Sequence, residues 1–168
     1  MWLAKLTGFL LMTGCGTYLG YKTSNRYKKR EKLLNETVLF CDSLINDITY
    51  LQPALKDMLE QKSNNYYELK PALNAFVKLL QNNAIVNIEV LKNNIPKGLF
   101  KDDEYPLFLG LLDILGKSDA QTQRGGIESV KHAFLIKQKT AMEESKKYGG
   151  LYLKLGFLGG LAAGIIIL

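Results

Sequence analysis

The sequence predicts an all-α protein: a cytosolic bundle of about six helices, flanked by an N-terminal and a C-terminal transmembrane helix. Three observations lead to this prediction. Both ends of the 168-residue chain are apolar, and glycine is scarce between Gly20 and Gly98. The middle repeats apolar residues at helical spacing and shows no strand-like alternation. We therefore expect transmembrane helices at residues 2–21 and 148–168, with the bundle at residues 22–147.

The two apolar ends have the length that a membrane requires. The first runs from Trp2 to Tyr21 and is interrupted only by Lys5. As a helix it spans ~30 Å, the thickness of the hydrocarbon layer, and Lys5 lies close enough to the interface to reach the headgroups. The second starts at Tyr148, has a similar length and contains one charge, on Lys154. Both segments are therefore predicted to cross the membrane.

Basic residues flank both apolar segments on their inner sides. Residues 22–32 carry six basic side chains and one acidic one, whereas residues 137–154 carry five basic and two acidic ones. Residues 36–136 hold ten basic and thirteen acidic residues. The positive-inside rule then puts both flanks and the bundle in the cytosol. We expect the first cluster to contact anionic lipids and not nucleic acid. Its basic residues are Lys22, Arg26, Lys28, Lys29, Arg30 and Lys32.

Within the bundle, apolar spacing and turn residues predict the helices in order. An apolar stripe over residues 34–51 follows the first apolar segment without proline or glycine, so one long helix is expected there. Pro53 and Pro71 suit the first turns of the next two helices. A short helix ends at Pro96. The next helix has Asp102 as its expected N-cap and an almost wholly apolar body, YPLFLGLLDIL, which should lie at the centre.

The last bundle helix begins at a capping-box pattern formed by Ser118 and Gln121. Its pattern runs towards Tyr148 and is compatible with a continuation into the second apolar segment. The pairs Gly125-Gly126 and Gly149-Gly150 are its expected weak points, since each glycine costs ~1 kcal/mol relative to alanine in a helix.

The sequence contains few residues that are suited to catalysis or cofactor binding. The single histidine, His132, lies in the middle of a predicted helix, and no glycine-rich phosphate loop is present. The acidic run at residues 102–104 is better explained by the positive end of a helix dipole than by a metal ion. Cys41 lies on the apolar stripe and is expected to be a reduced core thiol. We therefore expect no catalytic residue, no cofactor and no metal.

Glycine spacing in the apolar segments is a more specific signal. Gly16 and Gly20 form one G-x-x-x-G step, and Gly156, Gly160 and Gly164 form two more. Four-residue spacing places such glycines on one face of a helix, where another helix can approach closely. The pattern predicts helix packing, either between the two segments or with another protein.

An alternative interpretation treats the N-terminus as a lipoprotein signal. The residues Met12 to Cys15 are near a lipobox, and cleavage there would leave Cys15 lipidated and the body outside, as an extracellular helical binding module. The apolar run continues past Cys15, however, and a dense basic cluster follows it. Both features favour the membrane-anchor interpretation.

Several strings resemble the stage III sporulation protein AB family. They are GYKTSNRYKKREKLL followed by Ile48-Thr49-Tyr50, then LGKSDAQTQ, and the ending LYLKLGFLGGLAAGIIIL. The second string carries the motif residues Leu115, Gly116, Ser118, Asp119 and Gln123. The resemblance covers essentially the whole chain. Two family features are missing here: a Pro-Leu shortly after Tyr50 and a tryptophan near residues 84–90.

The resemblance implies a non-enzymatic membrane component of the apparatus that links mother cell and forespore in an endospore-forming bacterium. The family's helical domain is similar to the F-type platform proteins of type II secretion, which couple a cytosolic ATPase to a membrane assembly. By this analogy the chain would lie in the mother-cell membrane facing the forespore. It would bind the stage III sporulation protein AA ATPase and join the other stage III A membrane proteins.

Overall fold

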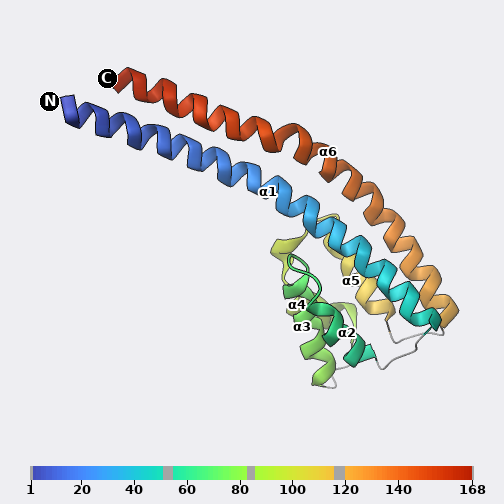
Figure 1. The fold of residues 1–168 in the computed structure, drawn as a ribbon. Helices are drawn as coiled ribbons and strands as arrows, with labels where there is room; N and C mark the ends of the chain where they lie inside the picture. Colours follow the sequence, from blue (N-terminus) through green and yellow to red (C-terminus); the bar gives the residue numbers. More distant parts are fainter. Residues whose placement is uncertain (1, 51–54, 83–85, 116–119, 168) are drawn as a thin grey trace. The chain divides into compact units, whose positions relative to one another are not determined.

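The computed structural model describes residues 2–50, 55–82, 86–115 and 120–167. These residues form six α-helices and one short 3₁₀-helix, and none of them lies in a strand, which confirms the all-α prediction. In chain order the elements are α1 (Trp2–Tyr50), α2 (Leu55–Ser63), α3 (Lys70–Gln81), α4 (Ile88–Asn94), η1 (Lys97–Leu99), α5 (Tyr105–Ile114) and α6 (Ala120–Ile167) (Figure 1).

The chain forms two compact units. Unit 1 consists of Met1–Glu31 and Lys139–Leu168, and unit 2 consists of Lys32–Gln138. Helices α1 and α6 each continue unbroken from one unit into the other. The expected membrane segments, 2–21 and 148–168, fall within the ranges of unit 1, whose two helices continue past them into the basic flanks.

Among the described residues, one helix is long and apolar enough to cross a membrane, and it is α6. Only 17% of its most apolar stretch is buried within the protein, whereas the core helix of a soluble fold is mostly buried. Helix α1 does not meet the same standard, because Lys5 and several threonines, tyrosines and glycines dilute its apolar segment. The N-terminal transmembrane helix therefore stays a prediction.

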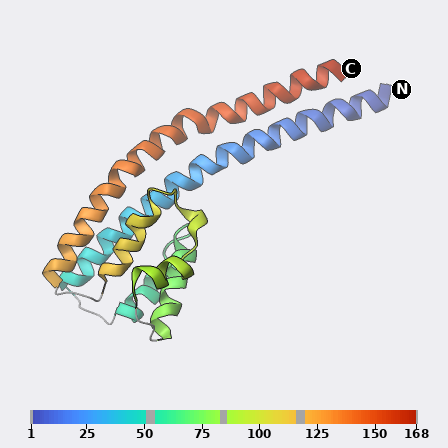
Figure 2. The ribbon, with the colours of Figure 1, turned by 180° about the vertical axis from the view of Figure 1, so that it is seen from behind.

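Unit 2 buries the apolar stripe that α1 carries at helical spacing. Leu34, Cys41 and Leu44 of this stripe are fully buried. In both views α2–α5 pack along the α1 and α6 segments of unit 2 (Figures 1 and 2). Half of the ten residues of α5 are buried, as its almost wholly apolar sequence predicts. They are Tyr105, Phe108, Leu109, Leu111 and Leu112.

The predicted start of α5 was wrong. The helix begins at Tyr105, and Asp102 lies exposed in the preceding turn instead of capping it. Glu104 closes this turn: its buried carboxylate accepts a hydrogen bond from the Lys101 N–H at 3.0 Å, and its own N–H donates to the Lys101 carbonyl. These bonds close the turn without Asp102, and Pro106, which has no N–H to satisfy, fixes the first helical turn.

The glycine pairs of α6 do not interrupt it, since the helix continues through both. At Gly126 a Cβ atom would lie 3.0 Å from Cδ1 of Ile114. A side chain at this position would displace the end of the Ile114 side chain, so glycine fits the local packing of α5 against α6. The expected capping box at Ser118 lies outside the described residues.

Candidate functional site

In unit 1, α1 and α6 pack side by side and antiparallel through glycine (Figures 1 and 2). A Cβ atom added at Gly16 would lie 2.7 Å from the Gly156 oxygen and 2.7 Å from Cα of Gly160. One added at Gly20 would lie 2.5 Å from the Tyr152 oxygen and 3.0 Å from Cα of Gly156. The two backbones are therefore in contact, and only hydrogen fits at these positions.

The three predicted packing glycines of α6, including Gly156, belong to the same interface. A Cβ atom at Gly160 would lie 3.0 Å from Cα of Thr13, and one at Gly164 would lie 2.6 Å from the Phe9 ring. The structure thus brings all five glycines together between the two segments.

Small residues continue this interface beyond the apolar segments, a feature that the sequence analysis missed. Ser24 and Ser145 are buried, and a Cβ atom at Gly149 would lie 3.8 Å from Oγ of Ser24 and 4.0 Å from Oγ of Ser145. Ser24 follows Gly20 by four residues, so extending the G-x-x-x-G pattern to serine would have found it.

An aromatic cluster covers one flank of the same helix pair. The ring centroid of Tyr27 lies 5.6 Å from that of Tyr148 and 5.8 Å from that of Tyr152, with the second pair stacked. Close by, Arg30 and Glu144 form an ion pair at 3.6 Å. These contacts join α1 to α6 by ring stacking and charge where both sequences are polar. We name Tyr27, Tyr148, Tyr152, Arg30 and Glu144 the aromatic flank.

Unit 2 contains a buried carboxylate that the sequence analysis also missed. Glu36 of α1 is only 7% exposed, and its Oε2 accepts three backbone hydrogen bonds. The donors are the N–H groups of Tyr67, Glu68 and Leu69, at 3.1, 2.8 and 2.9 Å. These groups lie at the entrance to α3, where no other side chain of the described residues caps the helix. Glu36 therefore ties the loop between α2 and α3 to α1.

Aromatic contacts hold the same loop. The Tyr66 ring meets Phe40 edge-on, with centroids 5.8 Å apart. The Lys32 ammonium lies 4.6 Å from the ring centroid of Tyr67. Lys32, which was predicted to contact lipid, makes this contact within unit 2, and its contact with lipid stays a prediction.

Within the four described ranges, no three histidine, cysteine or acidic side chains gather in a way that would hold a metal ion. His132 is exposed on α6. The distinctive features of the described residues are the helix packing of unit 1 and the anchored loop of unit 2.

A comparison with models of known protein families shows to which family the chain belongs. The model of the stage III sporulation protein AB family matches residues 5–168, nearly the whole chain. The chain belongs to the stage III sporulation protein AB family. This family is not known as an enzyme family, and membership implies a role associated with sporulation. Neither the curated proteins nor the solved structures with which the chain was compared include a match.

The family motif at residues 115–123 is described only at its ends. Leu115 is buried and forms the C-cap of α5, and Gln123 lies in the first turn of α6. Gly116, Ser118 and Asp119 lie outside the described residues, so their capping role stays a prediction.

The basic cluster of this family member is presented to solvent along α1. Lys22, Arg26, Lys28 and Lys29 are exposed, whereas Arg30 is partly covered by its ion pair with Glu144. This arrangement leaves the exposed side chains accessible to anionic headgroups.

Cys41 is expected to be inert in the folded protein. It is fully buried, and burial, followed by the charge of Asp42, raises the pKa of its thiol to about 12. Because the thiolate is the reactive form, we predict that Cys41 in a Cys15→Ser variant reacts with Ellman's reagent at pH 8 at least ~100-fold more slowly than in denatured protein. Absorbance measured with and without guanidinium tests this, and equal rates would contradict the buried site.

Proposed function

We propose that this chain is a non-enzymatic platform of the channel between mother cell and forespore. In this proposal α1 and α6 both cross the mother-cell membrane that faces the forespore, and unit 2 lies in the cytosol. There it binds the stage III sporulation protein AA ATPase and couples it to the other stage III A membrane proteins. Family membership supports the sporulation role, and the similarity of the family to secretion platforms supports the coupling role.

One structural observation favours a scaffold above all. Helices α1 and α6 are each continuous from the glycine-packed pair of unit 1 into the bundle of unit 2. No loop of the described residues separates the apolar segments from the bundle. A protein that connects a cytosolic motor to a membrane assembly benefits from such helical connections, because a flexible linker would transmit little force.

The packing of unit 1 favours this proposal over the lipoprotein alternative. Cleavage before Cys15 would remove Phe9 and Thr13, which lie against Gly164 and Gly160. Gly160 and Gly164 of α6 would then lose the residues of α1 against which they pack. A complete α1 keeps this interface intact.

The first experiment tests on which side of the membrane the bundle lies. Asn64 is exposed in the turn between α2 and α3, so a cysteine there would be accessible from the surrounding solution. In a variant with Cys15 and Cys41 replaced, we expect Asn64→Cys to resist a membrane-impermeant maleimide in intact cells and to react after lysis. Labelling of intact cells would reverse the proposed topology.

Coupling to the ATPase is tested separately. The full chain, reconstituted into liposomes, is expected to carry the purified AA ATPase with it in a flotation gradient, whereas protein-free liposomes of the same lipids should not. If the ATPase stays at the bottom in both cases while the chain itself floats, the coupling role is wrong and the membrane placement stands.

A further inference from the structure

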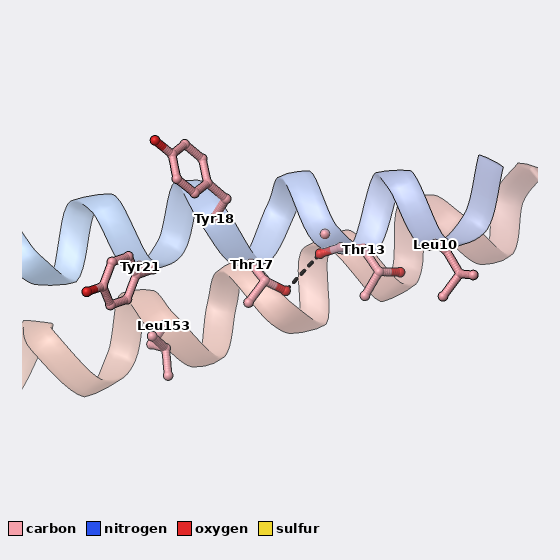
Figure 3. A pocket seen from close by; sticks show the side chains of 7 residues that line it. Leu10, Thr13, Thr17, Tyr18, Tyr21 and Leu153 are labelled. Atoms are coloured by element: carbon pink, nitrogen blue, oxygen red, sulfur yellow. Dashed lines mark hydrogen bonds between the residues drawn. The ribbon is translucent and has the colours of Figure 1, made fainter. Parts of the chain in front are cut away.

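A groove runs along the flank of the α1–α6 pair that lies within unit 1. It has a volume of about 570 Å³, inside the range of about 300–1,000 Å³ typical of sites for small molecules. Figure 3 shows that its lining comes mainly from α1, with one side chain from α6. The lining residues are Leu10, Thr13, Gly14, Thr17, Tyr18, Tyr21 and Leu153.

The groove is open to the surroundings and apolar, and its lining residues explain both properties. A Cβ atom at Gly14 would meet nothing within 4 Å, so this glycine, unlike Gly16 and Gly20, is not used by the helix pair. The Thr13 hydroxyl donates to the Phe9 carbonyl at 2.9 Å. The Thr17 hydroxyl donates to the Thr13 carbonyl at 2.7 Å (Figure 3). The threonines therefore use their hydroxyls within the helix, and the groove offers little to a polar ligand.

Cations follow the groove at the end that leads to the basic flanks. Lys28 lies seven residues after Tyr21, and Lys146 lies seven residues before Leu153, so each continues its side of the groove by two helical turns. Both are exposed, and Cε of Lys28 lies 3.9 Å from the Cβ position of Gly149 on α6. Glu31 lies three residues beyond Lys28, and Glu144, whose carboxylate pairs with Arg30, lies two residues before Lys146.

Two tyrosines line the end of the groove that is nearest to these lysines in the sequence. Tyr18 is 65% exposed and Tyr21 is 56% exposed, although both are large rings. Tyrosines concentrate at the level of the lipid headgroups, where a ring contacts acyl chains and its hydroxyl contacts water. The order from apolar groove through tyrosines to lysines matches the order from acyl chain to headgroup in a phospholipid.

We propose that the groove binds one acyl chain of an anionic phospholipid whose headgroup lies against Lys28 and Lys146. This inference rests on the membrane placement in the proposed function and goes beyond the general attraction of the basic cluster to a membrane. A helix of another protein would also fill an apolar groove. The lysines that follow its end on both helices favour a lipid, because a negatively charged headgroup is attracted to each of them.

Native mass spectrometry of the full chain tests the groove. The protein is purified in mild detergent and offered phosphatidylglycerol and phosphatidylethanolamine in equal amounts. Wild type is expected to retain phosphatidylglycerol preferentially. Gly14→Leu fills the groove and should lower its retention about tenfold, the effect of displacing two methylene groups. Gly159→Leu is the matched control, since Gly159 is also open but lies outside the groove.

A second pair of variants tests the headgroup site. Lys146→Gln should weaken the retention of phosphatidylglycerol about fivefold, the effect of losing one cation near a membrane surface. Lys147→Gln is the control, because the Lys147 ammonium lies 5.2 Å from the ring centroid of Tyr148, in the aromatic flank. Equal losses in the two variants would mean that the lipid follows overall charge, and the assigned site would be wrong.

Flotation with liposomes separates this inference from the proposed function. If wild type does not float, the membrane placement is wrong and the groove inference falls with it. If all variants float and Gly14→Leu retains lipid like wild type, only the groove inference is overturned. The groove inference is also overturned if Gly14→Leu leaves the lipid bound but removes a crosslink to another membrane helix. In that case the groove is occupied by a helix of another protein.

Discussion

Replacing Glu36 with alanine is expected to lower the free energy of unfolding of unit 2 by about 3 kcal/mol. The variant leaves the N–H groups of Tyr67, Glu68 and Leu69 without the acceptor that they share. Part of the loss is recovered when water reaches the loop, which keeps the cost below that of three separate buried donors. Hydrogen–deuterium exchange of the full chain in detergent should show these amides exchanging about 100-fold faster.

Two further variants make this result specific. Glu36→Gln keeps one acceptor oxygen but loses the charge, so it should cost about half as much as the alanine variant. Glu68→Ala removes a carboxylate from the same loop that accepts none of these bonds, and its effect should stay within about 0.5 kcal/mol. If the amides of this loop exchange at the same rate in the Glu36→Ala and Glu68→Ala variants, the buried carboxylate does not hold the loop.

Replacing Gly156 with leucine is expected to separate the two helices of unit 1. A Cβ atom there would lie 2.6 Å from the Gly16 oxygen and 2.7 Å from Cα of Gly20, and backbone cannot move aside as a side chain can. We expect a cost of about 1–3 kcal/mol to the pairing of α1 with α6, as for other overpacked interiors. A disulfide reporter made by Ser24→Cys and Gly149→Cys, with Cys15 and Cys41 replaced, should then form in much lower yield.

The matched control for this prediction is Gly159→Leu. It adds the same side chain to the same helix three residues away, at a glycine whose Cβ position meets nothing within 4 Å. Both variants make α6 more apolar, so neither should impair membrane insertion. Equal disulfide yields in the two variants would show that close packing at Gly156 is not needed to hold the helices together.

Local features of the sequence were enough to predict the helices and the five packing glycines. Helical periodicity, proline and glycine act over three or four residues, so their effects can be read in one segment at a time. The start of α5 shows the limit of such rules. Asp102 matched a common N-cap pattern, yet Glu104 and Lys101 close the turn and Tyr105 begins the helix. A competing local bond decided that boundary.

By itself the sequence determined the all-α class, the two apolar segments and the family to which the chain belongs. It left open whether the glycine faces meet each other or another protein, and it did not distinguish Gly14 from Gly16. Only the tertiary structure decided these points, because the interacting residues are far apart in the chain. The sequence analysis missed the role of Glu36 for the same reason, because its three hydrogen-bond partners lie more than thirty residues away in the chain. Its side chain matters because folding buries it beside N–H groups that no local pattern connects with it.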